Sequence, residues 1–127
     1  MASIFTKIIQ GEIPCYKIAE TEEYFAFLDI NPWEEGHTLV VPKKEVDYIF
    51  DLDDETYEGL MRFSKKIARA IEQAISCKRV GVLVEGLEVP HAHVHLIPIV
   101  DQFFARKKSD LTKEDFTQIA QKISSFL

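Results

Sequence analysis

The chain has 127 residues, of which 46% are hydrophobic and 28% are charged, and its formal net charge is −6. This length fits a single domain, over residues 1–127, and the composition excludes an intrinsically disordered chain. The acidic balance argues against nucleic-acid binding, because duplex binding depends on cationic contacts to phosphate.

The cysteines and the N-terminal segment bear on the compartment. Cys15 and Cys77 form no CxxC pair, so neither a disulfide framework nor a cysteine zinc site is expected. Lys7 and Gln10 interrupt the apolar stretch before Pro14, which leaves it too short for a membrane span or a signal-peptide core. We therefore expect a cytoplasmic protein with no membrane partner.

The N-terminal part of the chain predicts a short helix and three strands. Residues 4–10 place apolar side chains at helical spacing and stop at Gly11. Residues 16–19 and 24–29 have the aromatic and aliphatic composition of a hairpin. Residues 37–42 are rich in β-branched residues and predict the third strand.

A long helix and two further strands follow. The helix begins at Asp53 or Asp54, which suits an N-cap, and ends near Ser76. Its apolar residues recur every three or four positions: Leu60, Phe63, Ile67, Ile71 and Ile75. Residues 79–85 and 91–100 predict the fourth and fifth strands.

The C-terminal region predicts an amphipathic helix. Thr112 and Asp115 have the spacing of a capping box. The apolar stripe consists of Phe116, Ile119, Ile123 and Phe126. Arg106, Lys107 and Lys108 precede the helix, either as a solvated charged run or as an influence on substrate choice. Together the elements predict an α+β fold with about five antiparallel strands and helices packed on the sheet.

The four histidines indicate a functional site. His91, His93 and His95 alternate, so in a strand they lie on one face, roughly 6 to 7 Å apart along it. Ala92, Val94 and Leu96 then face the core. One surface histidine is commonly incidental, whereas three in strict alternation form a poor packing face. We therefore interpret the row as a site, with His37 as the fourth imidazole.

Two chemistries can use such a row. Alternating histidines can supply two zinc ligands, with Glu85 or Glu88 completing the coordination sphere. Imidazole, with an ordinary pKa of ~6.5, can also attack phosphorus while neighbouring rings donate hydrogen bonds or protons.

The segment from His91 to Pro98 resembles the His-φ-His-φ-His-φ-φ signature of the histidine-triad (HIT) family, where φ is apolar. Three upstream segments, residues 4–14, 26–32 and 36–43, resemble the N-terminal segments of the family and occur in the right order. The resemblance is strongest over residues 3–98. It implies a HIT-like fold with a short N-terminal, a long central and a C-terminal helix. It also implies a homodimer whose two sheets form one continuous ten-stranded sheet.

The resemblance also implies a reaction. His93 attacks the α-phosphate of a purine nucleotide conjugate, such as a phosphoramidate, an adenylate or a dinucleoside polyphosphate, and forms a transient nucleotidyl-histidine. His95 and His37 bind phosphate oxygens or assist the leaving group. His91 orients the nucleophile, whose second ring nitrogen donates to a backbone carbonyl. The family reaction needs no cofactor.

The same resemblance places the nucleoside. Asp29 binds the ribose hydroxyls, although a turn residue before Asn31 is the simpler interpretation of this aspartate. An apolar slot for the base is formed by Ile4, Phe5, Ile8, Phe27 and Ile30. Such a slot accepts adenine or guanine.

Two departures from the family pattern matter. Leu87 and Glu88 occupy positions where many members carry Gln and a hydroxyl residue that contacts phosphate. A nucleotide-binding module with little turnover is therefore the alternative function. Ser3 and Thr6 replace the Cys-x-x-Cys of some relatives, and Val46-Asp47 stands where a histidine is expected, so no bound metal is predicted.

Overall fold

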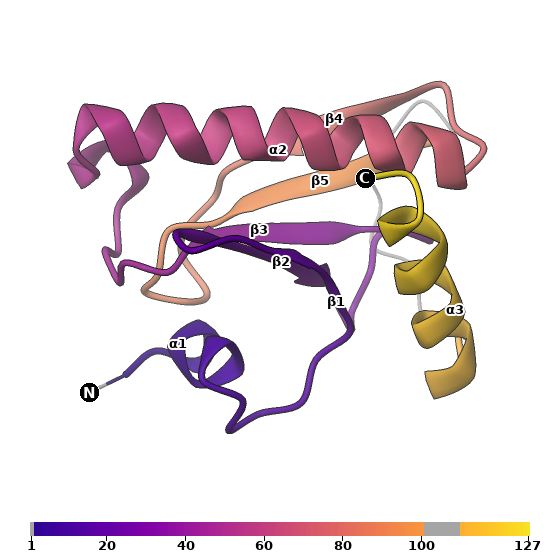
Figure 1. Cartoon of the computed structure of the whole chain (residues 1–127), viewed down its shortest axis with the longest axis horizontal. Coiled ribbons are helices and arrows are strands. Elements are labelled where there is room, and N and C mark those ends of the chain that lie inside the picture. The colour runs from indigo at the N-terminus through magenta and orange to yellow at the C-terminus, as the bar shows by residue number, and fades with distance from the viewer. Residues whose placement is uncertain (1, 101–109) are drawn as a thin grey trace.

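In the computed structural model, which describes residues 2–100 and 110–127, one antiparallel sheet has the strand order β1-β2-β3-β5-β4 (Figure 1). The strands are β1 (Lys17–Glu20), β2 (Tyr24–Leu28), β3 (Thr38–Pro42), β4 (Arg79–Leu83) and β5 (Val94–Ile99). The helices are α1 (Ile4–Ile9), α2 (Asp54–Ala74) and α3 (Lys113–Ser124), with a 3-10 turn at Ile49–Asp51. The predicted α+β fold is confirmed.

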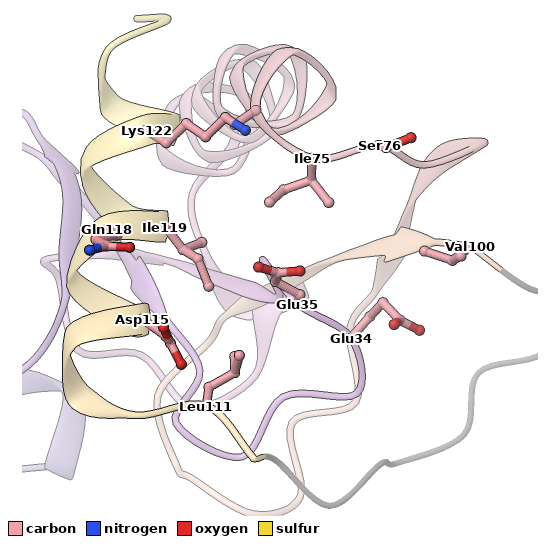
Figure 2. Close-up of a pocket in the computed structure, with 11 residues that line it drawn as sticks. Glu34, Glu35, Ile75, Ser76, Val100, Leu111, Asp115, Gln118, Ile119 and Lys122 are labelled. Carbon is pink, nitrogen blue, oxygen red and sulfur yellow. The ribbon is translucent and has the colours of Figure 1, made fainter.

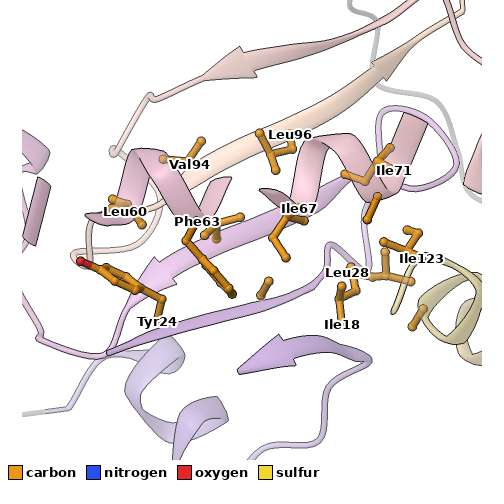
Figure 3. Close-up of a cluster of buried hydrophobic side chains, with 14 of the residues drawn as sticks. Ile18, Tyr24, Leu28, Leu60, Phe63, Ile67, Ile71, Val94, Leu96 and Ile123 are labelled. Carbon is orange, nitrogen blue, oxygen red and sulfur yellow. The ribbon is translucent and has the colours of Figure 1, made fainter. Parts of the chain in front are cut away.

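The two faces of the sheet are covered by different helices (Figure 1). Alternate β2 residues point to opposite sides. Ala26 and Leu28 join the main core, in which α2 and α3 pack on the sheet (Figure 3). Phe25 and Phe27 form a second cluster on the other face with Phe5 of α1. Residues on that second face are therefore close to the N-terminal helix.

Local sequence signals account for the helix boundaries. The Asp53 carboxylate accepts a hydrogen bond from the Thr56 amide and caps α2. Thr112 and Asp115 form the predicted capping box at the start of α3. Phe126 lies beyond the end of α3 and is 47% exposed, so its assignment to the apolar stripe is wrong. Within the described residues, no helix combines the length and apolarity needed to cross a membrane.

The fifth strand is shorter than predicted. It begins at Val94 rather than His91, so only His95 of the three alternating histidines belongs to a strand. The Ala92 amide donates to the Val46 carbonyl, and the His91 carbonyl accepts from the side chain of His93, so this segment makes no ladder with β3. Arg106, Lys107 and Lys108 lie outside the described residues.

Candidate active site

The four histidines gather on the face of the sheet that α1 covers. The three alternating side chains and His37 are all buried. His95 pairs with Leu39 of β3, while the intervening residues Ala92, Val94 and Leu96 belong to the main core on the opposite face. The predicted alternation is therefore present, although His91 and His93 precede the strand.

The imidazole of His93 has a defined tautomer. Its Nδ1 lies 2.7 Å from the backbone carbonyl oxygen of His91. A carbonyl can only accept a hydrogen bond, so Nδ1 carries the proton. In the neutral ring Nε2 then holds the lone pair, which is the form required of a nucleophile.

A second chain of hydrogen bonds fixes the tautomers of His37 and His95. The backbone amide of Trp33 donates to Nδ1 of His37 at 3.0 Å, so the His37 proton is on Nε2. That Nε2–H donates to Nδ1 of His95, also at 3.0 Å. His95 therefore carries its own proton on Nε2 and can donate it to a phosphate oxygen or a leaving group.

His91 is held by two partners from distant parts of the chain. Its Nε2 lies 2.7 Å from the carbonyl oxygen of Pro42, and its Nδ1 lies 2.7 Å from the hydroxyl of Ser3. Burial lowers the pKa of His91 below its ordinary value, so the ring is neutral near pH 7. Both ring nitrogens of His91 therefore form hydrogen bonds with Ser3 and Pro42. The contact of His91 with the ring of His93 is made by the backbone carbonyl oxygen of His91.

A cavity of about 220 Å³ brings together the residues predicted to bind a nucleotide. His93 and His95 form part of its wall together with Asp29. The residues predicted to form the base slot also line it: Ile4, Phe5, Ile8, Phe27 and Ile30. Among the described residues lining the cavity there is no lysine or arginine, so imidazole N–H groups are available in place of a cationic side chain to bind an anionic group there.

Aromatic contacts connect the predicted base slot to His93. The ring of Phe5 meets His93 edge to face, with centroids 4.9 Å apart, and meets Phe27 at 5.6 Å. Edge-to-face packing at these distances is favourable and restricts the orientation of both rings. Phe5 is itself 6% exposed, so α1 covers His93 as well as the predicted base slot.

Asp29 has the turn role considered from the sequence, and its carboxylate also reaches the histidine cluster. Its Oδ1 accepts a hydrogen bond from the Asn31 amide at 2.8 Å, which is the turn role. Its Oδ2 lies 3.6 Å from Nε2 of His37, and its side chain lines the cavity. One carboxylate oxygen thus shapes the loop while the other faces the histidine cluster.

A group of possible metal ligands other than the alternating histidines with Glu85 or Glu88 does not fit these hydrogen bonds. Asp29, His37 and His95 place ligand atoms within 4.8 Å of one another. However, the amide of Trp33 keeps Nδ1 of His37 as an acceptor, so Nε2 is protonated and has no lone pair for a metal.

The position that holds the Cys-x-x-Cys of some relatives does not suit zinc either. Glu45, rather than Val46 or Asp47, lies beside Ser3, Thr6 and His91, with its Oε1 2.6 Å from the Thr6 hydroxyl. Neutral hydroxyls are not among the usual protein ligands of zinc.

Sequence reasoning missed several residues of the site. Ile13, Pro14, Cys15, Leu39 and Val89 also line the cavity. Leu39 was within reach of prediction, because residues of β3 that alternate with Val40 face α1. The involvement of Glu45 required the tertiary structure, since no local motif marks it.

A larger cavity, of about 510 Å³, lies away from the histidines (Figure 2). It is bounded by Glu34 and Glu35, by the end of α2 at Ile75, and by Ile119 and Lys122 of α3. It contains none of the predicted site residues. The residues predicted to bind the nucleoside gather instead in the smaller cavity beneath α1.

Comparison with known proteins gives consistent matches. The family model described as HIT domain matches residues 10–101. An uncharacterized HIT-like protein of Borreliella burgdorferi is 36% identical over 132 residues, covering 95% of each chain. The adenosine 5′-monophosphoramidase of Saccharomyces cerevisiae is 39% identical over 102 residues, covering 80% of this chain and 65% of its own. A crystal structure of a Hit-like protein from Bartonella henselae superposes with a TM-score of 0.88 at 32% identity, covering 98% of this chain and 96% of the other.

Proposed function

The chain belongs to the HIT family, and we propose that it is a nucleotide hydrolase or nucleotidyl transferase whose nucleophile is Nε2 of His93. The observation that carries the proposal is the hydrogen bond from Nδ1 of His93 to the His91 carbonyl, in the wall of the cavity that contains Asp29 and the apolar slot. The similarity to an adenosine 5′-monophosphoramidase supports a purine nucleotide conjugate as the substrate class.

The proposed reaction has two displacements at phosphorus. The lone pair on Nε2 of His93 forms a bond to the α-phosphorus, and the bond to the leaving group breaks with its electron pair. An amine or phosphate leaving group takes up a proton as it departs. Water then attacks the phosphorus and releases one proton, which balances the proton taken up by the leaving group. The bond from phosphorus to His93 breaks with its electron pair returning to Nε2, and the nucleotide is released with an oxygen from water. A different acceptor in the second step makes the reaction a transfer.

The other imidazoles have separate roles in this proposal. His95 donates from Nε2 to a phosphate oxygen or to the leaving group, and its Nδ1 accepts a hydrogen bond from Nε2–H of His37. His37 thereby holds His95 in the donor tautomer. His91 orients His93 through its carbonyl oxygen. These donors stabilise the extra negative charge that develops on the phosphoryl oxygens.

The nucleoside occupies the remaining parts of the cavity. Base stacking on an aromatic ring contributes about 1 to 3 kcal/mol, which suits the rings of Phe5 and Phe27. Asp29 accepts hydrogen bonds from the ribose hydroxyls. Aliphatic contacts come from Ile4, Ile8 and Ile30. This slot does not by itself distinguish adenine from guanine.

The test is to trap the covalent intermediate. Wild-type protein turning over labelled adenosine 5′-monophosphoramidate and quenched without acid should yield an adduct on His93, and His93→Ala should yield none and lose turnover. AMP binding by the variant is the control for a folded site. Absence of an adduct from the wild type during turnover contradicts the proposal. A rate unaffected by His93→Ala, with normal nucleotide affinity, assigns the chain to the alternative, a binding module.

We also propose a homodimer formed along β4. This strand is at the edge of the sheet, and an open edge readily pairs with another strand. Val82 and Val84 are 54% and 38% exposed on or beside it. Antiparallel pairing of two β4 strands makes a continuous ten-stranded sheet. Light scattering after size exclusion should give twice the chain mass for the wild type and a smaller mass for Val82→Lys, and a monomeric wild type contradicts the proposal.

A further inference from the structure

A carboxylate outside the cavity, Glu45, binds the N-terminus of α1. Its Oε1 accepts a hydrogen bond from the Ser3 amide at 2.7 Å and another from the Thr6 hydroxyl at 2.6 Å. These two donors hold the pKa of Glu45 at about 2, well below its ordinary value. The carboxylate is therefore ionised at any pH at which the protein works, although the side chain itself is exposed.

The direction of the neighbouring hydrogen bonds can be derived. Nε2 of His91 faces a carbonyl oxygen, that of Pro42, and so carries the proton of the neutral ring. Nδ1 of His91 is then an acceptor, and the Ser3 hydroxyl 2.7 Å away donates to it. The same Ser3 oxygen accepts from the Thr6 amide at 3.1 Å and caps α1. In this arrangement Ser3 Oγ accepts from the Thr6 amide and donates to His91, while the Thr6 hydroxyl donates to Glu45.

The helix that Glu45 holds cannot position itself. An isolated helix shorter than about 12 residues is unstable in water, and α1 has 6 residues. Its place depends on tertiary contacts at its ends and along its buried side. Phe5 on this helix contacts the ring of His93, and Ile8 lines the cavity. A shift of α1 therefore moves both the base slot and the packing around the nucleophile.

The segment that carries Glu45 also forms hydrogen bonds with the histidine segment. The carbonyl of Val46, the next residue, accepts a hydrogen bond from the Ala92 amide at 2.7 Å. Residues 42–46 thus contact His91 through Pro42, Ala92 through Val46, and α1 through Glu45. Together with the hydrogen bond between Ser3 and His91, these contacts form a closed circuit from α1 to His91, on to Pro42 and through Glu45 back to α1.

We propose that Glu45 is a positioning residue. Its hydrogen bonds fix α1 over the base slot and orient the Ser3 hydroxyl toward Nδ1 of His91. His91 is thereby held where its carbonyl oxygen accepts the hydrogen bond from Nδ1 of His93. This inference rests on the proposed function, because it assigns Glu45 a part in that reaction. Glu45 acts through Ser3 and His91 and does not itself contact the cavity wall.

The test compares Glu45→Ala with Glu45→Gln. A glutamine Oε1 can accept both hydrogen bonds, whereas alanine accepts neither. We expect about a tenfold loss of kcat/KM for Glu45→Ala, which is the size expected for a lost hydrogen bond to a charged group. In Glu45→Gln most of the wild-type kcat/KM should be retained. Thr6→Val removes one of the two bonds at nearly constant shape and should give an intermediate loss. Glu22→Ala, an exposed carboxylate on the β1–β2 turn, is the matched control and should behave as wild type.

Two measurements separate positioning from a loss of stability. Affinity for AMP reports on the base slot, and nitrogen NMR reports on Nδ1 of His91, whose signal should move toward that of an unbonded imidazole nitrogen in Glu45→Ala. Unchanged kcat/KM, AMP affinity and His91 signal in Glu45→Ala overturn the inference, as does an equal loss in Glu45→Gln. If Glu45→Ala does not fold, Thr6→Val carries the same comparison. Failure of the wild type to turn over substrate would count against the proposed function alone, because the His91 signal tests the hydrogen bonds without turnover.

Discussion

Removing the imidazole of His91 should change how stability depends on pH. His91 is 0% exposed and forms hydrogen bonds through both ring nitrogens. We consider His91→Gln, because glutamine can donate and accept hydrogen bonds but does not titrate. At pH 8 the variant should be less stable by about 1 to 3 kcal/mol, since the flexible glutamine side chain cannot reproduce both bonds.

The sign of the pH effect follows from the lowered pKa. Burial places the pKa of folded His91 below its ordinary value of 6.5, which is retained in the unfolded chain. Below pH 6.5 the unfolded chain therefore binds a proton that the folded protein does not, and this favours unfolding. The contribution is fully present above pH 6.5 and is lost as the pH falls toward the folded pKa, at about 1.4 kcal/mol per pH unit.

Urea unfolding between pH 8 and pH 5 measures this difference. The difference in the free energy of unfolding between wild type and His91→Gln should narrow once the pH is below the pKa of His91 in the unfolded chain. The binding of one proton sets the largest slope, about 1.4 kcal/mol per pH unit. Other titrating groups are common to both proteins and cancel in the difference. A gap that stays constant over the whole range refutes the argument that His91 is buried in its neutral form.

Three further changes test other parts of the structure. Gly59→Ala should destabilise by about 1 to 3 kcal/mol in urea unfolding, instead of gaining helix propensity, because the new Cβ would overlap the hydroxyl of Tyr24; a more stable variant contradicts this contact. Glu88→Gln should tighten AMP binding about threefold at low salt, by removing an exposed negative charge at the cavity rim, and equal affinities would show that Glu88 is too far from the phosphate. Asp29→Asn should reduce the preference for AMP over its 2′,3′-dideoxy analogue in calorimetry while keeping the turn to Asn31, because the charged acceptor of the ribose hydroxyls is lost; an unchanged preference contradicts ribose binding by the Asp29 carboxylate.

The elements of the fold were accessible from the sequence because their signals are local. The helical spacing along α2, its Asp53 cap and the capping box of α3 each depend on residues within a few positions of one another. The start of β5 was not accessible. Its boundary is set by hydrogen bonds from a segment nearly fifty residues away, at Pro42 and Val46, which take His91 and Ala92 out of the ladder.

The candidate site, like the fold, could be predicted from the sequence only in part. Alternation predicted that three imidazoles share one face, and the family resemblance supplied the base slot and Asp29, whose residues line one cavity with His93 and His95. The hydrogen bonds that set each tautomer could not be read from spacing, since the partners are a loop amide and two carbonyls. Glu45 gives no signal of its own in the sequence. An exposed glutamate next to two lysines is ordinary surface composition.

The tautomers of His93 and His37 are set by main-chain groups, the carbonyl of His91 and the amide of Trp33. No side-chain substitution deletes the His91 carbonyl, and only a proline at position 33 would delete the Trp33 amide hydrogen. Over evolution, the cavity wall can therefore exchange residues and accept new leaving groups or bases without resetting the protonation pattern that the proposed reaction requires. A site whose tautomers are fixed by the main chain can therefore diverge in substrate choice through substitutions in the cavity wall.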